Sequence, residues 1–229
     1  MFGTNPVTHQ DLTKDELNIV EVFYTIQGEG PFSGRPAVFV RLAGCNLRCS
    51  WCDTDFTSKS DPYKPSEIVR DVICAADGKT KLVVVTGGEP LLQNVMPLFT
   101  LLEKFGFEIQ IETAGTVWVP GLEDLNNTTI VCSPKTKNVH PNIKLHCNNF
   151  KYVIGTGDLV EDGKFVTRTQ ANGAVVTLAS PKESAQIWVQ PRDDQDAAKN
   201  EQNLLMVAEI CMELGYRMCI QLHKLIGAR

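Results

Sequence analysis

The sequence predicts an α/β fold in which a parallel sheet forms a partial, irregular (β/α) barrel with several helices shortened or lost. Three observations predict it. About seven short runs rich in apolar and β-branched residues are spread along the 229 residues, amphipathic helical patterns separate some of them, and other connections show no helical pattern. A chain of this length can bury one sizeable core, so we expect a single domain over residues 1–229.

The elements alternate along the chain. Residues 1–18 are polar and are expected to form a loosely held arm. Helical periodicity ends at a glycine in three segments, 65–76, 91–105 and 197–214. Residues 136–149 are rich in Asn, Pro and His, so no helix is expected there. The expected strands are 36–44, 81–90, 107–113, 129–135, 150–154, 185–191 and 216–223.

Active sites of parallel barrels lie at the carboxyl ends of the strands. The predicted strand ends therefore predict the location of a site. The residues at or just past these ends are Cys45, Gly87, Thr113, Ser133 and Gln190.

Composition excludes several classes of partner. The 22 Lys and Arg against 27 Asp and Glu give a formal net charge of -5, so nothing favours nucleic acid or an anionic membrane. No apolar run approaches the roughly 18–20 residues of a spanning helix, and we find no secretory signal. We therefore expect a cytoplasmic protein with reduced thiols, whose eight cysteines serve metal binding and packing.

Three of these cysteines lie within eight residues in the stretch CNLRCSWC, with the spacing C-x3-C-x2-C. Thiolates suit zinc and iron–sulfur clusters, and a loop after a strand can point several sulfurs inward. A structural zinc needs a fourth ligand, which does not follow at a usual spacing. A [4Fe-4S] cluster bound by Cys45, Cys49 and Cys52 would instead leave one iron open to a ligand. Zinc and three unrelated buried thiols remain alternatives.

The stretch TGGEP, residues 86–90, follows another strand. Its two glycines permit close approach of the backbone to a ligand, or simply a tight turn. The carboxylate after them could hold a cation or an amino group. Taken alone, this stretch does not choose between the two interpretations.

The two stretches together resemble the radical S-adenosylmethionine (SAM) superfamily. Its cysteine motif matches Cys45, Cys49 and Cys52, and its glycine-rich motif matches Gly87, Gly88 and Glu89. The resemblance implies that the open iron chelates SAM, and that one electron cleaves SAM to a radical that takes hydrogen from a substrate. It also implies a barrel of the radical SAM type.

A closer resemblance, to the 7-carboxy-7-deazaguanine synthase family, extends through most of the chain. It rests on residues 23–54 (FYTIQGEG to CDT), VVVTGGEP, IQIETAGT, VCSPK, WVQP and QLHK, in this order. It implies a lyase of queuosine and other 7-deazapurine biosynthesis. That enzyme contracts the ring of 6-carboxy-5,6,7,8-tetrahydropterin with loss of ammonia, regenerates SAM and uses Mg²⁺.

The resemblance also implies roles for residues at matching positions. Arg41 suits the substrate carboxylate, and Thr54 is the expected Mg²⁺ ligand. The other expected substrate contacts are Ile26, Gln27, Gly28, Thr86 and His223. The expected SAM contacts are Trp51, Cys52, Asp53, Gly88, Glu89, Glu112, Ser133, Pro134, Lys135 and Gln190.

The family implies a homodimer and an electron donor such as flavodoxin. The ending LIGAR, residues 225–229, departs from the family pattern and leaves the carboxy-terminal contacts open. Two other functions compete: another radical SAM enzyme, such as a glycyl-radical activase, and a non-catalytic zinc-binding module. The TIQGEG turn and Arg41 argue against the first, and the three-cysteine motif argues against the second.

Overall fold

A computed structural model describes residues 6–52, 54 and 60–228. The strands are β1 (Leu17–Ile26), β2 (Pro36–Leu42), β3 (Asp61–Tyr63), β4 (Leu82–Gly87), β5 (Glu108–Thr113), β6 (Thr128–Cys132), β7 (Asn149–Ile154), β8 (Leu159–Glu161), β9 (Lys164–Thr167), β10 (Val176–Thr177), β11 (Gln186–Pro191) and β12 (Arg217–Met218). The α-helices are α1 (Pro65–Ala76), α2 (Met96–Lys104), α3 (Pro141–His146), α4 (Ala197–Leu214) and α5 (Leu222–Leu225). Three short 3₁₀ helices are η1 (Gly30–Phe32), η2 (Pro90–Leu92) and η3 (Leu122–Asp124).

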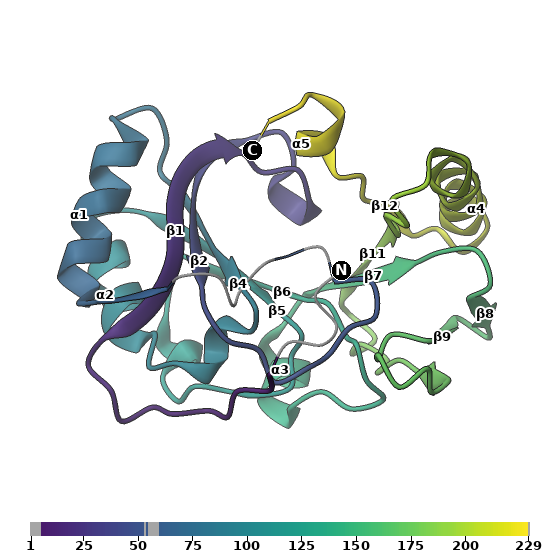
Figure 1. Ribbon diagram of the computed structural model, residues 1–229, viewed down its shortest axis with the longest axis horizontal. Coiled ribbons are helices and arrows are strands. Elements are labelled where there is room, and N and C mark those ends of the chain that lie inside the picture. Colours follow the sequence, from purple (N-terminus) through teal and green to yellow (C-terminus); the bar gives the residue numbers. More distant parts are fainter. Residues whose placement is uncertain (1–5, 53, 55–59, 229) are drawn as a thin grey trace.

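The main sheet has nine strands in the order β12-β11-β7-β6-β5-β4-β2-β1-β3. The run from β2 to β12 is parallel, whereas β1 and β3 pair antiparallel at one edge. The sheet curves without closing, and α1 and α4 lie at its opposite ends (Figure 1). The expected partial, irregular barrel is therefore confirmed.

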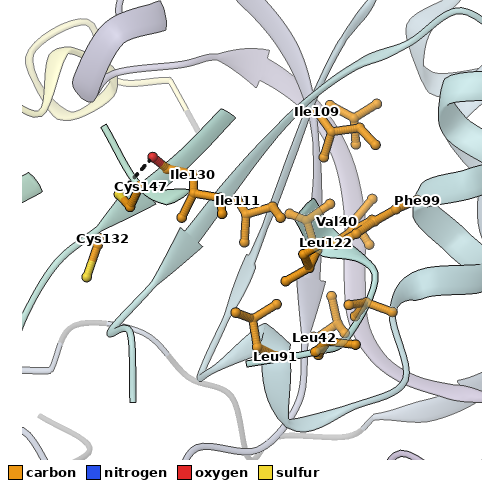
Figure 2. Close-up of a cluster of buried hydrophobic side chains, with 14 of the residues drawn as sticks. Val40, Leu42, Leu91, Phe99, Ile109, Ile111, Leu122, Ile130, Cys132 and Cys147 are labelled. Carbon is orange, nitrogen blue, oxygen red and sulfur yellow. Dashed lines mark hydrogen bonds between the residues drawn. The ribbon is translucent and has the colours of Figure 1, made fainter. Parts of the chain in front are cut away.

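Helices cover the outer face of this sheet, and the core lies between them. Alternate strand residues point to this side, among them Val40, Ile109 and Ile111, and they pack with Phe99 of α2 (Figure 2). The opposite, inner face carries Arg41, Thr86, Glu112, Lys151 and Gln190 on β2, β4, β5, β7 and β11. Because side chains alternate between the faces of a strand, the register that buries the core also lines up these polar groups.

Local signals explain where the long helices begin and end. Pro65 begins α1, and the Lys64 backbone N–H donates to Glu67 at 2.8 Å. Asp196 caps α4 by accepting from the Lys199 backbone N–H at 3.0 Å, and Gly215 ends it with φ of 67°.

The structure corrects several expected elements. The expected helix 91–105 divides into η2 and α2, since Pro97 favours a new helix start. The expected strand 216–223 forms only the two residues of β12, followed by α5. Residues 136–149 do contain a helix, α3, which His140 caps through Nδ1. The sequence patterns did not predict β1, β3 or the separate sheet of β8, β9 and β10.

The amino-terminal arm is attached to the body from Thr8 onward, contrary to the expected loose attachment. The Thr8 backbone N–H donates to the Cys45 carbonyl at 2.8 Å, and that of Asp11 donates to Leu92 at 2.8 Å. Gln10 donates to the carbonyls of Leu91 and Trp118. One of these bonds satisfies the carbonyl of Cys45 itself, which polarity along the sequence cannot reveal. No helix in the described ranges has the length and hydropathy needed to cross a membrane.

Candidate active site

A cavity of about 590 Å³ opens at the carboxyl ends of the parallel strands, where the sequence predicted a site. Its lining comes from β1, β2, β4, β5, β7, β11 and α5, and from loops that follow the strands, including β6. About 590 Å³ is within the range of cofactor and substrate pockets. The three cysteines, Arg41 and Lys151 all line this one space.

The cysteine loop begins directly after β2. Cys45 is 8 % exposed and lines the cavity together with Cys49 and Cys52. Burial raises the pKa of the Cys45 thiol to about 12, so its thiolate needs a cationic partner inside the cavity. Among the described residues, no three His, Cys, Asp or Glu groups lie close enough to hold a single metal ion. Three thiols around one open cavity suit a larger iron–sulfur unit with one iron left free of protein.

The glycine turn after β4 lies tightly against this loop. A Cβ added to Gly88 would overlap the Gly44 carbonyl oxygen and lie 2.8 Å from the Cys45 Cβ. The next residue, Glu89, is fully buried and accepts from the Thr113 hydroxyl and the Ala114 backbone N–H, both at 2.8 Å. Burial raises the pKa of Glu89, and these bonds partly offset that effect. Its carboxylate therefore ties the glycine turn to the end of β5.

A second group of site residues surrounds Trp51. The Lys135 ammonium lies 5.3 Å from the centre of the Trp51 ring and donates to the Ser133 hydroxyl at 2.5 Å. Burial lowers the pKa of Lys135. The indole Nε1 of Trp51 is buried and makes no hydrogen bond in the described structure. An unpartnered donor beside a cation is consistent with a bound polar ligand at this end of the cavity.

The floor of the cavity carries a buried ionic network. Lys151 on β7 pairs with Glu29 and, at 2.9 Å, with Glu112 on β5. Glu29 also accepts from Gln221 at 2.9 Å. Burial alone would raise the pKa of Glu29, but the Lys151 ammonium outweighs it and lowers the pKa to about 2. Burial raises the pKa of Glu112, so this carboxylate takes up a proton more readily than Glu29 does.

The opposite wall carries Arg41, whose guanidinium Nε donates to Glu21 at 2.8 Å. The register pairs Arg41 with Glu21 on one side and with Thr86 on the other. The guanidinium carbon also lies 5.7 Å from the centre of the Phe23 ring. Arg41 and Thr86 therefore present a guanidinium and a hydroxyl side by side in the cavity wall.

The carboxy-terminal segment covers the turn after β1. The Leu222 backbone N–H donates to the Gly28 carbonyl at 3.3 Å. A Cβ added to Gly28 would overlap His223 Nδ1 and lie 2.9 Å from the His223 backbone nitrogen. Gln27 is 2 % exposed, and its side chain accepts from the Glu29 backbone N–H at 3.0 Å. The short helix α5 therefore brings His223 to the cavity.

The structure brings most of the predicted site residues together. Asp53 lies outside the described residues. Four predicted contacts are not among the residues that line the cavity: Ile26, Gly28, Glu89 and Pro134. Those that line it are Gln27, Arg41, Cys45, Cys49, Trp51, Cys52, Thr54, Thr86, Gly88, Glu112, Ser133, Lys135, Gln190 and His223.

Three residues of the buried ionic network, Glu29, Lys151 and Gln221, were not predicted as site residues from the sequence. A signal for Lys151 was present, since it is a lone charge within the apolar strand FKYVI. Nothing local marked Glu29 and Gln221 as its neighbours. They meet only because the turn after β1 and the chain end fold over the same sheet face.

An open parallel barrel with a three-cysteine loop after one strand and a glycine turn after the next defines the class of radical SAM enzymes. A family model described as "Radical SAM superfamily" matches residues 40–147. The chain is 43% identical to the 7-carboxy-7-deazaguanine synthase of Rhodospirillum rubrum, over 99% of this chain and 99% of that one. It is 32% identical to the enzyme of that name from Rickettsia prowazekii, over 99% and 95% of the two chains.

A solved structure agrees. The crystal structure of QueE from Escherichia coli aligns with a TM-score of 0.67 and 27% identity, and covers 91% of this chain and 95% of that one. The chain belongs to the 7-carboxy-7-deazaguanine synthase family. As a member of the radical SAM superfamily, it is a lyase that works with a [4Fe-4S] cluster and SAM.

Proposed function

We propose that this chain contracts the ring of 6-carboxy-5,6,7,8-tetrahydropterin to give 7-carboxy-7-deazaguanine and ammonia, in queuosine and other 7-deazapurine biosynthesis. Family membership supports this reaction. One observation on this chain supports it as well. The three cysteine thiols, the Arg41 guanidinium and a buried set of hydrogen-bonding groups all line one cavity. Substrate and products differ by no net oxidation, so the cavity needs to supply a radical without an external oxidant.

The proposed cofactor site lies at the cysteine end of the cavity. Cys45, Cys49 and Cys52 hold the [4Fe-4S] cluster, and bound cluster and SAM together supply the chemistry that removes hydrogen from the substrate. Gly88 leaves room beside the cluster loop, and Glu89 holds this turn through Thr113 rather than from the cavity wall. The other proposed SAM contacts are Trp51, Asp53, Glu112, Ser133, Pro134, Lys135 and Gln190.

The proposed substrate site lies between Arg41 and the Lys151 network. Arg41 binds the substrate carboxylate, and Thr86 adds a hydroxyl from the next strand. A pterin presents a row of ring N–H and amino donors, which suits the carboxylate of Glu29. Ile26, Gln27 and Gly28 shape the turn above it, and His223 closes it from α5.

We propose Mg²⁺ as a further cofactor, bound by Thr54 together with substrate oxygens and water. Thr54 lines the cavity, and its carbonyl oxygen accepts from the Cys52 thiol at 3.6 Å. Mg²⁺ keeps several waters and often uses few protein ligands, so a single threonine is sufficient on the protein side.

The experiment is an anaerobic assay with carboxypterin, SAM, Mg²⁺ and a low-potential reductant, with the product identified by mass. We expect conversion by the parent chain and none by Cys49→Ala. Cys74→Ala is the matched control, since Cys74 is exposed on α1. Product formation by Cys49→Ala at the parent rate would refute the proposal. Zinc in place of iron and sulfide in the anaerobic protein would favour a zinc module instead.

We propose that the chain is a cytoplasmic homodimer that receives its electron from a flavodoxin-like donor. The family resemblance supports the dimer, and the chemistry requires a one-electron donor of low potential. Sedimentation of the anaerobic protein tests the dimer. Product formation with reduced flavodoxin in place of a chemical reductant tests the donor.

A further inference from the structure

The loop that joins β9 to β10 lies against the cysteine loop. It belongs to the separate three-stranded sheet β10-β9-β8, which the proposed reaction has not used. Its residues 168–171 run antiparallel to residues 48–50, with Cys49 and Gln170 as bridge partners. The small sheet therefore adds one strand-like segment to the cysteine loop.

Two backbone hydrogen bonds hold the two segments together. The Ser50 N–H donates to the Thr169 carbonyl at 2.8 Å, and the Ala171 N–H donates to the Arg48 carbonyl at 2.7 Å. Thr169 is fully buried, and its hydroxyl donates to the Lys135 carbonyl at 2.5 Å. The β9–β10 loop is therefore hydrogen-bonded both to the loop after β6 and to the cysteine loop.

The Gln170 side chain sits at the centre of this contact. Its carbonyl oxygen accepts from the Arg48 backbone N–H at 3.3 Å. Its amide nitrogen lies 3.9 Å from the Cys49 sulfur and 3.3 Å from the Lys135 carbonyl oxygen, within donating reach of both. The amide therefore has a donor directed at one of the three proposed cluster ligands.

A donor to a ligating sulfur stabilises negative charge on the cluster. The reduced cluster carries one more electron than the oxidised cluster, so the donor favours the reduced form and raises the reduction potential. We propose that Gln170 is a positioning residue that orients Cys49 and makes the cluster easier to reduce. This inference rests on the proposed ligand set of Cys45, Cys49 and Cys52.

The test measures the reduction potential of the reconstituted cluster, without SAM, by titration with mediators and electron paramagnetic resonance. Gln170→Met keeps the length of the side chain but has no N–H donor. Gln170→Glu keeps an acceptor for the Arg48 N–H and, when ionised, also has no donor. Both should lower the ratio of reduced to oxidised cluster at a fixed potential at least threefold, which is about 30 mV for a one-electron couple.

Two control variants separate the amide from the loop around it. Asn172→Ala changes the same loop, where Asn172 accepts from the Ala174 N–H. Ser50→Ala removes hydroxyl contacts to the carbonyls of Arg168 and Thr169 but leaves the sulfur donor in place. Both controls should retain the parent potential, and all four variants should retain the parent iron and sulfide content.

Three results would overturn the inference. First, Gln170→Met and Gln170→Glu could show the parent reduction potential while they retain the parent iron and sulfide content. Ser50→Ala could shift the potential as far as Gln170→Met, which would assign the effect to the loop contact. Both Gln170 variants could lose the cluster, which would make the residue part of its attachment. Failure of the proposed function would differ, since the parent chain itself would then assemble no cluster or convert no carboxypterin.

Discussion

Two single charged residues, Arg41 and Lys151, line this cavity. Arg41 interrupts the apolar strand β2, and Lys151 interrupts the apolar strand β7, so both charges enter the interior of the curved sheet. Each has a carboxylate partner from a neighbouring segment, Glu21 for Arg41 and Glu29 for Lys151. Charges buried in this way are costly without partners, which makes them sensitive positions for substitution.

Arg41→Lys should weaken substrate binding more than turnover. A lysine keeps the charge but cannot make the two parallel hydrogen bonds that a guanidinium makes to a carboxylate. We expect KM for carboxypterin to rise about tenfold, equivalent to about 1.4 kcal/mol, with kcat within about threefold of the parent. Steady-state kinetics measure both, and Arg70→Lys on the exposed face of α1 is the control. An unchanged KM would remove Arg41 from the substrate site.

Lys151→Met should destabilise the fold strongly. It leaves Glu29 and Glu112 buried without their cation, and breaking a buried pair costs about 3–5 kcal/mol of unfolding free energy. Anaerobic urea unfolding at neutral pH measures the loss. Lys164→Met at an exposed position of β9 should change little. A loss below about 1 kcal/mol would contradict the assigned network.

The same variant should reverse the contribution of Glu29 to the pH dependence of stability. In the parent, the folded-state pKa of Glu29 is lowered from 4.5 to about 2, so its contribution is lost as pH falls from about 4.5 towards 2. Without Lys151, burial raises the pKa of Glu29 above its unfolded value, as it already does for Glu112 in the parent. Unfolding free energy should then rise as pH falls towards 4.5, which unfolding at a series of pH values can measure.

At the scale of secondary-structure elements, loops and short helices hold the site residues in place. The cysteine loop contacts the arm at Thr8, the glycine turn at Gly88 and the β9–β10 loop at Gln170. The helix α5 contacts the turn after β1 from the far end of the chain. Because each contact joins segments distant in sequence, a change at one of them should move a site residue on another.

Gly28→Ala should displace α5 and withdraw His223 from the cavity. The added Cβ overlaps the imidazole and crowds the backbone nitrogens of His223 and Leu222. We expect kcat/KM to fall at least tenfold, with melting of the main fold changed by only a few degrees, because α5 has only four residues. His223→Ala and the double variant complete a mutant cycle. Strict additivity of the two losses would argue against a shared effect.

At the scale of the whole molecule, the cavity lies between segments that are far apart in the sequence. The cavity takes residues from Val20 to Lys224, and the sheet that carries it runs from residue 17 to residue 218. Such a site exists only in the folded chain. Ligand binding should therefore stabilise the whole sheet rather than one loop.

SAM should raise the melting temperature of the cluster-containing protein. At about 100 times its Kd, a ligand that binds only the folded state adds about 2.7 kcal/mol, or about 5–10 °C for a chain of this size. Anaerobic scanning calorimetry or fluorimetry measures the shift. Cys45→Ala should show almost none, because it lacks the open iron that would hold SAM. An equal shift in melting temperature for Cys45→Ala would show that SAM binding does not require the cluster.

The sequence alone predicted the α/β class, the side of the sheet that carries the site, and the residues with a local signature. The cysteine spacing, the glycine turn and the charge within β2 are all visible within a few neighbouring residues. Strand periodicity and glycine stops likewise depend on near neighbours. Family membership, expected from the motifs, was confirmed across almost the whole chain.

Only the tertiary structure decided which distant groups meet. The pairing of Lys151 with Glu29, the attachment of the arm to Cys45, and the approach of Gln170 to Cys49 each join residues about 35 to 120 positions apart. The antiparallel strand β1 and the two-residue β12 likewise depend on partners elsewhere in the sheet. Such contacts follow from register and from how loops fold over the strand ends, and no short-range pattern encodes them.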